Sequence, residues 1–260
     1  MQLAAINNPR HTLIAEIEWI AANGFSQIDL LLAAPGAAVE STDWAAIRSA
    51  LIEHHLGVIV QAAPYLPIDN PSPLVRQAAL DELRRAVDVA QTLGATLCTT
   101  RFCGWPAYMA EAAGYEYYRQ LYEILLKHGQ ARGVQVALEN SPDNRQQLKY
   151  FREIFHRLPG LKLVYNVGHA NIQTVQSLTR DYLFALADRL VHVRMSDNGG
   201  VTHDCLPFGA PATGGIDGLR ELRTLRSFRY GGSITVDIAG DRRWLLAGAD
   251  LLRAWWPQAG

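Results

Sequence analysis

The residues of this chain whose types could do chemistry stand where short apolar runs end. Glu139 closes the run VQVALE, Asn166 closes KLVYN, and Asp237 follows SITV. Side chains of a strand alternate between two faces, so each polar residue would point away from its apolar neighbours, towards the inside of a sheet or barrel. The same alternation turns further polar residues inward: Asp29, Gln61, Arg101, His192 and Arg194.

Such a set of side chains would either hold a metal ion or form internal ion pairs. Burying a charged group is unfavourable unless it is paired or binds a cation. Carboxylate oxygens, one imidazole and one amide oxygen suit Mn²⁺, Co²⁺, Mg²⁺ or Zn²⁺. The alternative is a salt bridge of Glu139 and Asp237 with Arg101 or Arg194, since both arginines belong to the same set.

The elements that must position these residues alternate along the whole chain. The expected strands cover 3–6, 26–32, 58–64, 95–102, 134–140, 162–168, 190–197 and 233–240, and the expected helices cover 12–24, 41–57, 72–94, 115–129, 144–160, 177–189, 218–231 and 241–256. Alternating strands and helices predict a parallel sheet. Eight repeats favour a single (β/α)₈ TIM barrel, one domain over residues 1–260, whose chemistry lies at the carboxyl ends of the strands.

Composition excludes several classes of protein. The chain is 49% hydrophobic and 19% charged, as in packed globular proteins, and its net charge of −1 argues against nucleic acid or an anionic membrane as partner. We find no apolar run long enough to span a membrane, and no signal peptide at the N-terminus. Cys98, Cys103 and Cys205 form no metal-type pair motif, which is typical of reduced thiols, so a cytoplasmic protein is expected.

Several segments also resemble one known family. VALENSPDN, LVYNVGHANI, LVHVRMSDNGG, HDCLPFGAPATGGIDGLREL and YGGSITVDI occur in the order and at about the spacing of the xylose isomerase-like TIM barrels. That superfamily includes sugar-phosphate isomerases and epimerases, ketose 3-epimerases, hydroxypyruvate isomerase, inosose dehydratase and endonuclease IV. The resemblance covers nearly the whole chain, but its motifs are short and degenerate, so it indicates the superfamily rather than a substrate.

The resemblance implies a metal site and an acid/base pair. Family members that act on sugars hold one metal with Glu, Asp, His and Glu from the last four strands. The matching positions here are Glu139, Asn166, His192 and Asp237. Asn166 replaces an Asp and Asp237 replaces a Glu, so metal binding is expected to be weaker. Glu139 and Asp237 would be the acid and base that move a proton next to a carbonyl, through an enediolate.

The resemblance and the strand ends also give candidate residues for binding the substrate. His169 matches a family histidine that contacts substrate or a second metal, and His203 matches a histidine of the loop after the seventh strand. Either arginine would bind an anionic group. Trp105 would stack on a sugar ring or pack within its own loop. The expected substrate-binding set is His169, Arg101, Arg194, His203, Gln61 and Trp105.

The expected function is therefore a metal-dependent isomerase or epimerase of a sugar or sugar-like polyhydroxy carbonyl compound. Its partners would be this small molecule and, as one option, further copies of the chain in a homo-oligomer. Two alternatives stay open. A dehydratase of an inosose-like compound would use a similar site, and the altered ligands would also fit a metal-free or non-catalytic sugar-binding barrel. Endonuclease IV is disfavoured, because Gln61 stands where that enzyme has a histidine.

Overall fold

The strands follow one another in chain order around a closed barrel in the computed structural model, which describes residues 1–144 and 147–260. The strands are β1 (Gln2–Ile6), β2 (Gln27–Leu31), β3 (Gly57–Gln61), β4 (Leu97–Arg101), β5 (Gln135–Glu139), β6 (Lys162–Asn166), β7 (Leu190–Met195) and β8 (Ser233–Val236). The predicted (β/α)₈ fold is confirmed.

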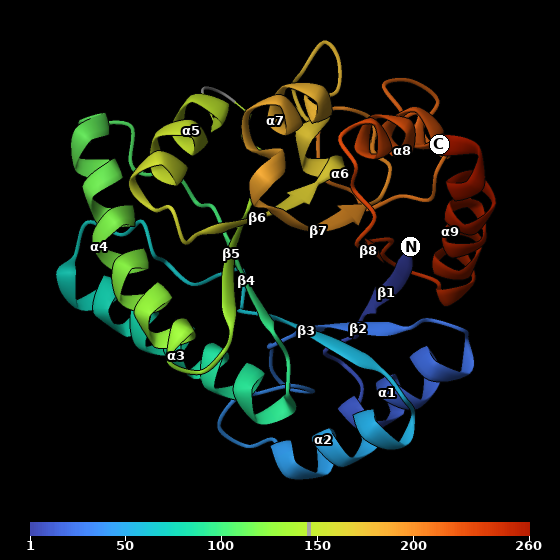
Figure 1. Cartoon of the computed structure of the whole chain (residues 1–260), viewed down its shortest axis with the longest axis horizontal. Coiled ribbons are helices and arrows are strands. Elements are labelled where there is room, and N and C mark those ends of the chain that lie inside the picture. Colours follow the sequence, from blue (N-terminus) through green and yellow to red (C-terminus); the bar gives the residue numbers. More distant parts are fainter. Residues whose placement is uncertain (145–146) are drawn as a thin grey trace. The chain divides into compact units, whose positions relative to one another are not determined.

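The helices alternate with the strands (Figure 1). They are α1 (Leu13–Ala22), α2 (Trp44–Glu53), α3 (Pro73–Leu93), α4 (Glu111–Gln130), α5 (Gln147–Arg157), α6 (Val167–Ala170), α7 (Thr179–Leu186), α8 (Gly218–Ser227) and α9 (Arg242–Trp255), with short 3₁₀ turns η1 (Ala187–Arg189) and η2 (Trp256–Ala259). The helix expected over 144–160 is found as α5, and its residues Arg145 and Gln146 lie outside the described part of the chain.

Residue contacts divide the chain into two compact units. We define the N-terminal unit as Ile6–Glu139 with Lys149–Lys162, and the C-terminal unit as Met1–Ala5, Asn140–Leu148 and Leu163–Gly260. That residues 1–260 form one domain stays a prediction.

Parallel pairing sets the register of the strands in the N-terminal unit. β2 pairs with β3 along its whole length, and the last residues of β4 and β5, Arg101 and Glu139, are partners. Helices α1 to α4 lie along the outside of these strands (Figure 1). The sequence explains the longest of them, because Pro73 opens α3 and Gly94, at φ 77°, ends it.

Parallel pairing likewise joins the strands of the C-terminal unit. In β6, β7 and β8, one level of the sheet consists of Asn166, Arg194 and Thr235. β1 continues this sheet beyond β8, with Ala5 opposite Val236. The carboxyl ends of β6, β7 and β8 therefore meet at one edge, which places the side chains of the candidate site.

None of the helices within the described residues is long and apolar enough to cross a membrane.

Candidate functional site

The ends of β6 and β8 bring two of the predicted site residues together. Asn166 is the last residue of β6, and Asp237 directly follows β8. The amide nitrogen Nδ2 of Asn166 donates to Asp237 Oδ2 over 3.2 Å. The amide oxygen of Asn166 accepts the backbone N–H of His169 at 3.1 Å and so caps α6. Asn166 thereby holds both the start of α6 and the Asp237 carboxylate.

Two histidines lie ring against ring beside that carboxylate. His169 Nε2 and His203 Nδ1 are 3.2 Å apart, and His169 Nδ1 lies 2.5 Å from the carbonyl oxygen of Asn140. A carbonyl oxygen only accepts, so we assign the proton of neutral His169 to Nδ1 and let its Nε2 accept from His203 Nδ1. The lone pair of His203 is then on Nε2, which lies 3.7 Å from Asp237 Oδ2.

Cys205 completes a cluster that was not predicted. Its Sγ lies 3.6 Å and 3.7 Å from the two ring nitrogens of His203, and 3.9 Å from Asp237 Oδ1. In residues 1–144 and 147–260, one group of His, Cys, Asp or Glu side chains has ligand atoms close enough to share a metal ion. It consists of His203, Cys205 and Asp237. We name these three residues the His–Cys–Asp cluster. No pair motif in the sequence indicates it, because Cys205 reaches Asp237 through the fold of a loop.

The loop between β7 and α8, which carries His203 and Cys205, is fastened by Asp197. Asp197 pairs with Leu206 through two backbone hydrogen bonds of 2.9 Å. Its carboxylate, which is wholly buried, accepts three backbone N–H groups, from Asn198 at 2.8 Å, Gly209 at 2.8 Å and Ile216 at 2.7 Å. Asp197 was not among the predicted site residues. Its signal was the polar pair Asp-Asn shortly after a buried strand, followed by two glycines.

His192 lies deeper than the predicted metal site. The level of Asn166 in the sheet is that of Arg194, and His192 stands two residues earlier in β7, which is about 6–7 Å lower. His192 is fully buried, and its ring nitrogens lie 2.8 Å from the hydroxyls of Ser233 and Thr235. Both ring nitrogens thus lie at hydrogen-bond distance from hydroxyl groups, and His192 as a metal ligand stays a prediction that these contacts do not support. Arg194 is also buried, at 1% exposure.

The four residues predicted to hold a metal do not fit that role together. Asn166 turns its NH₂ group, a donor, towards Asp237 and uses its oxygen as a helix cap. Both ring nitrogens of His192 contact hydroxyl groups of β8. Asn166 and His192 thus make contacts other than those of metal ligands. The reaction proposed below therefore uses no metal held by Glu139, Asn166, His192 and Asp237.

The remaining strand-end candidates belong to the N-terminal unit. Glu139, at 3% exposure, ends β5 beside Arg101 at the end of β4. Gln61 ends β3, and its side-chain oxygen is buried with no hydrogen-bond partner among the described residues. Asp29 is fully buried in the middle of β2, so it lies below the strand ends.

Trp105 packs within its own unit. Its ring lies 4.5 Å from that of Tyr150 and 5.2 Å from that of Tyr115, measured between centroids, and it also contacts the rings of Phe102 and Tyr118. Gly114 makes room for it, since a Cβ there would lie 2.2 Å from the indole ring. Of the two roles expected for Trp105, loop packing is the one that these contacts support.

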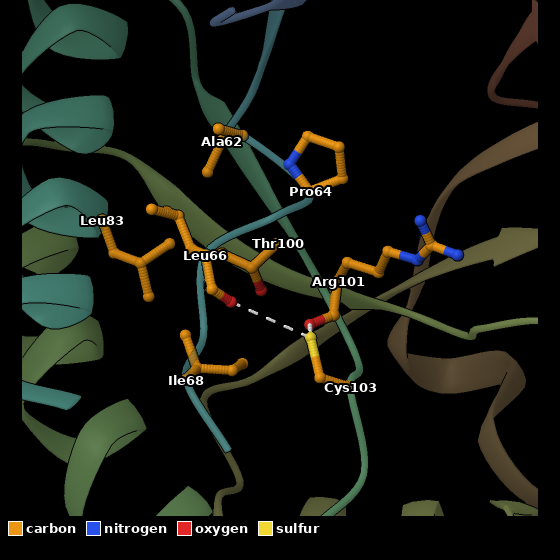
Figure 2. A pocket seen from close by; sticks show the side chains of 9 residues that line it. Ala62, Pro64, Leu66, Ile68, Leu83, Thr100, Arg101 and Cys103 are labelled. Carbon is orange, nitrogen blue, oxygen red and sulfur yellow. Dashed lines mark hydrogen bonds between the residues drawn. The ribbon is translucent and has the colours of Figure 1, made fainter. Parts of the chain in front are cut away.

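A small cavity lies beside Arg101 (Figure 2). Leu66, Ile68 and Leu83 line its apolar side, and the Arg101 side chain points away from them. The cavity measures about 10 Å³, which is room for about one water molecule. It is too small to hold a sugar.

Comparison with known proteins agrees with the fold. Solved structures that resemble the chain include a D-tagatose 3-epimerase-like protein (17% identity, 100% of this chain and 98% of that one, TM-score 0.86). Others are 3-keto-D-glucoside 4-epimerase from E. coli (16%, 98% and 99%, TM-score 0.80) and a Thermus thermophilus protein soaked with ZnCl₂ (19%, 99% and 99%, TM-score 0.77). At these identities the likeness shows a shared fold. No curated protein matches the chain.

The chain also matches a known protein family. The family described as xylose isomerase-like TIM barrel matches residues 17–255, which is nearly the whole chain. The match spans all strands from β2 to β8, and with them Glu139, Asn166 and Asp237. The chain therefore belongs to the xylose isomerase-like TIM barrel family.

Proposed function

We propose that the protein is an enzyme, an isomerase or epimerase of a sugar or sugar-like polyhydroxy carbonyl compound. Family membership supports this, as do the names of two structures that share its fold, a D-tagatose 3-epimerase-like protein and a 3-keto-D-glucoside 4-epimerase. The observation that carries the proposal is the grouping of Asp237 with Asn166, His203 and His169 at the carboxyl ends of β6 and β8.

The proposed reaction is proton abstraction at the carbon next to a carbonyl group. Asp237 has the chemistry of the base, and the Asn166 amide holds one of its oxygens, which fixes the direction of the carboxylate. His203 is proposed to offer its Nε2 to a substrate hydroxyl group, and His169, whose Nε2 contacts His203 Nδ1, to position that ring beside the substrate. Glu139, at the end of β5, is proposed as the second carboxylate, which returns the proton on the opposite face or at the neighbouring carbon.

The cationic side chains complete the proposed binding set. Arg101 and Arg194, each at or near the end of its strand, would pair with an anionic group such as a phosphate or carboxylate. A preference for phosphorylated or acidic sugars over neutral ones would follow from them.

The test is solvent exchange on a panel of ketoses, ketose phosphates and inososes in D₂O, followed by proton NMR. The wild-type protein should place deuterium at the carbon next to the carbonyl and form an epimer or isomer. Asp237→Asn and Glu139→Gln should each slow exchange about 10²–10⁴-fold, the usual contribution of an acid or base. Asp204→Asn, an exposed change in the loop that carries His203, is the matched control.

The outcomes separate the proposal from its alternatives. Exchange at wild-type rate in both carboxylate variants would exclude the proposed pair. Loss of one water from the substrate, seen by mass spectrometry, would identify a dehydratase instead. The structure favours one further candidate, a barrel that binds sugars without catalysis, because Asn166 and His192 are committed to other contacts. Binding by calorimetry with no exchange in any compound would support that candidate.

A further inference from the structure

We propose that the His–Cys–Asp cluster is a binding site for a divalent cation that prefers thiolate, with Zn²⁺ as the best candidate. The ligand atoms are His203 Nε2, Cys205 Sγ and one carboxylate oxygen of Asp237. This site differs from the one expected at Glu139, Asn166, His192 and Asp237, with which it shares a single residue. The proposal does not depend on the proposed reaction, because metal binding is measured directly.

One ligand atom from each of the three side chains lies within 4.8 Å of the others, which is close to the separations around zinc. Typical zinc bonds to sulfur, nitrogen and oxygen at tetrahedral angles put the ligand atoms about 3.4–3.6 Å apart. In the cluster, Sγ lies 3.7 Å from His203 Nε2 and 3.9 Å from Asp237 Oδ1, and Nε2 lies 3.7 Å from Asp237 Oδ2. At 3.7 Å the imidazole and the carboxylate are too far apart for a hydrogen bond, yet each is placed to share a cation.

The hydrogen bonds behind His203 prepare its Nε2 for a metal. The Asn140 carbonyl fixes the proton of His169 on Nδ1, so His169 Nε2 accepts the Nδ1–H of His203. A metal-binding histidine usually donates its other N–H to such an acceptor, which fixes the ring and makes the free nitrogen more basic. His169 is therefore not a metal ligand in this proposal; it positions the ring of the ligand His203.

The backbone holds Cys205 against the other two ligands. Cys205 has φ 50°, a left-handed conformation that is uncommon for a residue with a side chain. Its carbonyl oxygen accepts the N–H of Ala239, two residues after Asp237, at 2.9 Å. This bond ties the loop of Cys205 to the segment that carries the carboxylate.

A second observation points to a ligand at the same place. Ser196 is fully buried, and its hydroxyl oxygen has no hydrogen-bond partner in the part of the chain that the structure describes. A Cβ built on Gly168 would lie 2.8 Å from Ser196 Oγ and 3.0 Å from His203 Nε2, so both atoms border one spot. A water or substrate oxygen in the fourth position of a three-ligand zinc ion would give this hydroxyl a partner.

The ligand types select the metal. Thiolate and imidazole favour Zn²⁺, and the related ion Co²⁺, whereas Mg²⁺ and Ca²⁺ prefer oxygen alone. Binding displaces the proton of the Cys205 thiol into solvent, so affinity should rise with pH.

Titration of the chelator-treated protein with Co²⁺ is the direct test. The wild-type protein should bind one ion per chain and show the near-ultraviolet thiolate-to-cobalt charge-transfer band, which Zn²⁺ then removes. Cys205→Ser should abolish the band and weaken Zn²⁺ binding more than about 100-fold, beyond the effect of an outer partner. Cys103→Ser, at an exposed thiol, is the matched control and should leave both unchanged.

Two further measurements test the role of His169 behind the ligand His203, and test the site in the wild-type protein, where misfolding of a variant plays no part. His169→Gln should keep the band but lower Zn²⁺ affinity about 10–100-fold, as loss of an outer partner does. In the wild-type protein, Zn²⁺ should slow alkylation of Cys205 by iodoacetamide, measured by peptide mass spectrometry. No thiolate band, a band that survives Cys205→Ser, or equal alkylation rates with and without Zn²⁺ would each overturn the proposal.

Discussion

Asn166 does two things that an aspartate at the same position would not do together. Its oxygen caps α6, and its NH₂ group donates to Asp237. A carboxylate could still accept the N–H of His169, but it has no proton to give at neutral pH. The amide therefore gives Asp237 a hydrogen bond at a place where a second carboxylate would repel it.

We expect Asn166→Asp to destabilise the protein in the absence of divalent ions. The change replaces a hydrogen bond with two like charges at about the same distance, and the expected loss is about 1–3 kcal/mol of unfolding free energy. Urea unfolding with chelator present measures it. Added Mn²⁺ or Zn²⁺ should stabilise the variant more than the wild type, because a cation can join the two carboxylates.

The control for this prediction is Asn70→Asp. Asn70 accepts the N–H of Ser72 through its oxygen, which an aspartate can also do. Its unfolding free energy should change little. If Asn166→Asp proved as stable as the wild type in chelator, the Asn166–Asp237 hydrogen bond would contribute little to stability.

The alternation of strand side chains predicts on which face of the sheet a residue lies. It does not predict at which height along the strand the residue meets its neighbours. It located Asn166 and Asp237 at strand ends, and the family resemblance added His169 and His203. It could not tell that His192 lies one level below Asn166, because alternate residues of a strand share a face at different heights. Cys205 could not be assigned either, since its place depends on a left-handed backbone angle within a loop.

At the scale of elements, the loop between β7 and α8 is the part that builds the His–Cys–Asp cluster. Residues 196–217 contain no helix or strand, so backbone groups must find partners elsewhere. Asp197 supplies them at one point, with its backbone paired to Leu206 and its carboxylate bound to three N–H groups. One buried side chain thereby sets the path of the whole loop.

Replacing Asp197 with alanine should loosen this loop and destabilise the protein. Three charge-assisted hydrogen bonds are lost, and buried N–H groups are left without an acceptor, so we expect a loss of about 3 kcal/mol or more. Hydrogen exchange should speed up most at Gly209 and Ile216, whose N–H groups the carboxylate accepts. Asp197→Asn should cost less, and Asp204→Ala, exposed in the same loop, should leave exchange at both amides unchanged.

Most elements could be predicted because their signals are local. Each expected strand and helix has a counterpart, and the start of α3 follows from Pro73. α6 was missed, since its four residues continue an apolar run and the helix depends on the cap at Asn166. A single helix was expected over residues 177–189, whereas the structure has α7 followed by the 3₁₀ turn η1.

At the scale of the whole molecule, buried carboxylates make stability depend on pH. Glu221 on α8 is 2% exposed, and burial raises its pKa, a shift that hydroxyls of Thr179 and Ser177 partly offset. Its Oε2 has no hydrogen-bond partner among the described residues. The folded protein then holds the proton of Glu221 more tightly than the unfolded chain, so its contribution to stability falls as pH rises above the ordinary value.

Glu221→Gln should therefore flatten the pH dependence of unfolding. The decrease in unfolding free energy between about pH 5 and about pH 8 should be smaller in the variant, as measured by urea unfolding at both values. Glu116→Gln is the control of opposite sign, because Arg119 lowers the pKa of Glu116 to about 2. Glu116→Gln should change the pH dependence of the unfolding free energy only in more acidic solution, below about pH 5. An unchanged slope in Glu221→Gln would show that Glu221 is not ionising in this range.

The hydrogen bond between Asn166 and Asp237 also has an evolutionary side. Asparagine and aspartate codons differ in a single nucleotide, so this chain stands one point mutation from a carboxylate at the end of β6. The helix cap would survive that mutation, because either side chain can accept the N–H of His169. A single-nucleotide substitution can therefore add a carboxylate ligand for a cation at this strand end. The cap of α6 is kept when it does so.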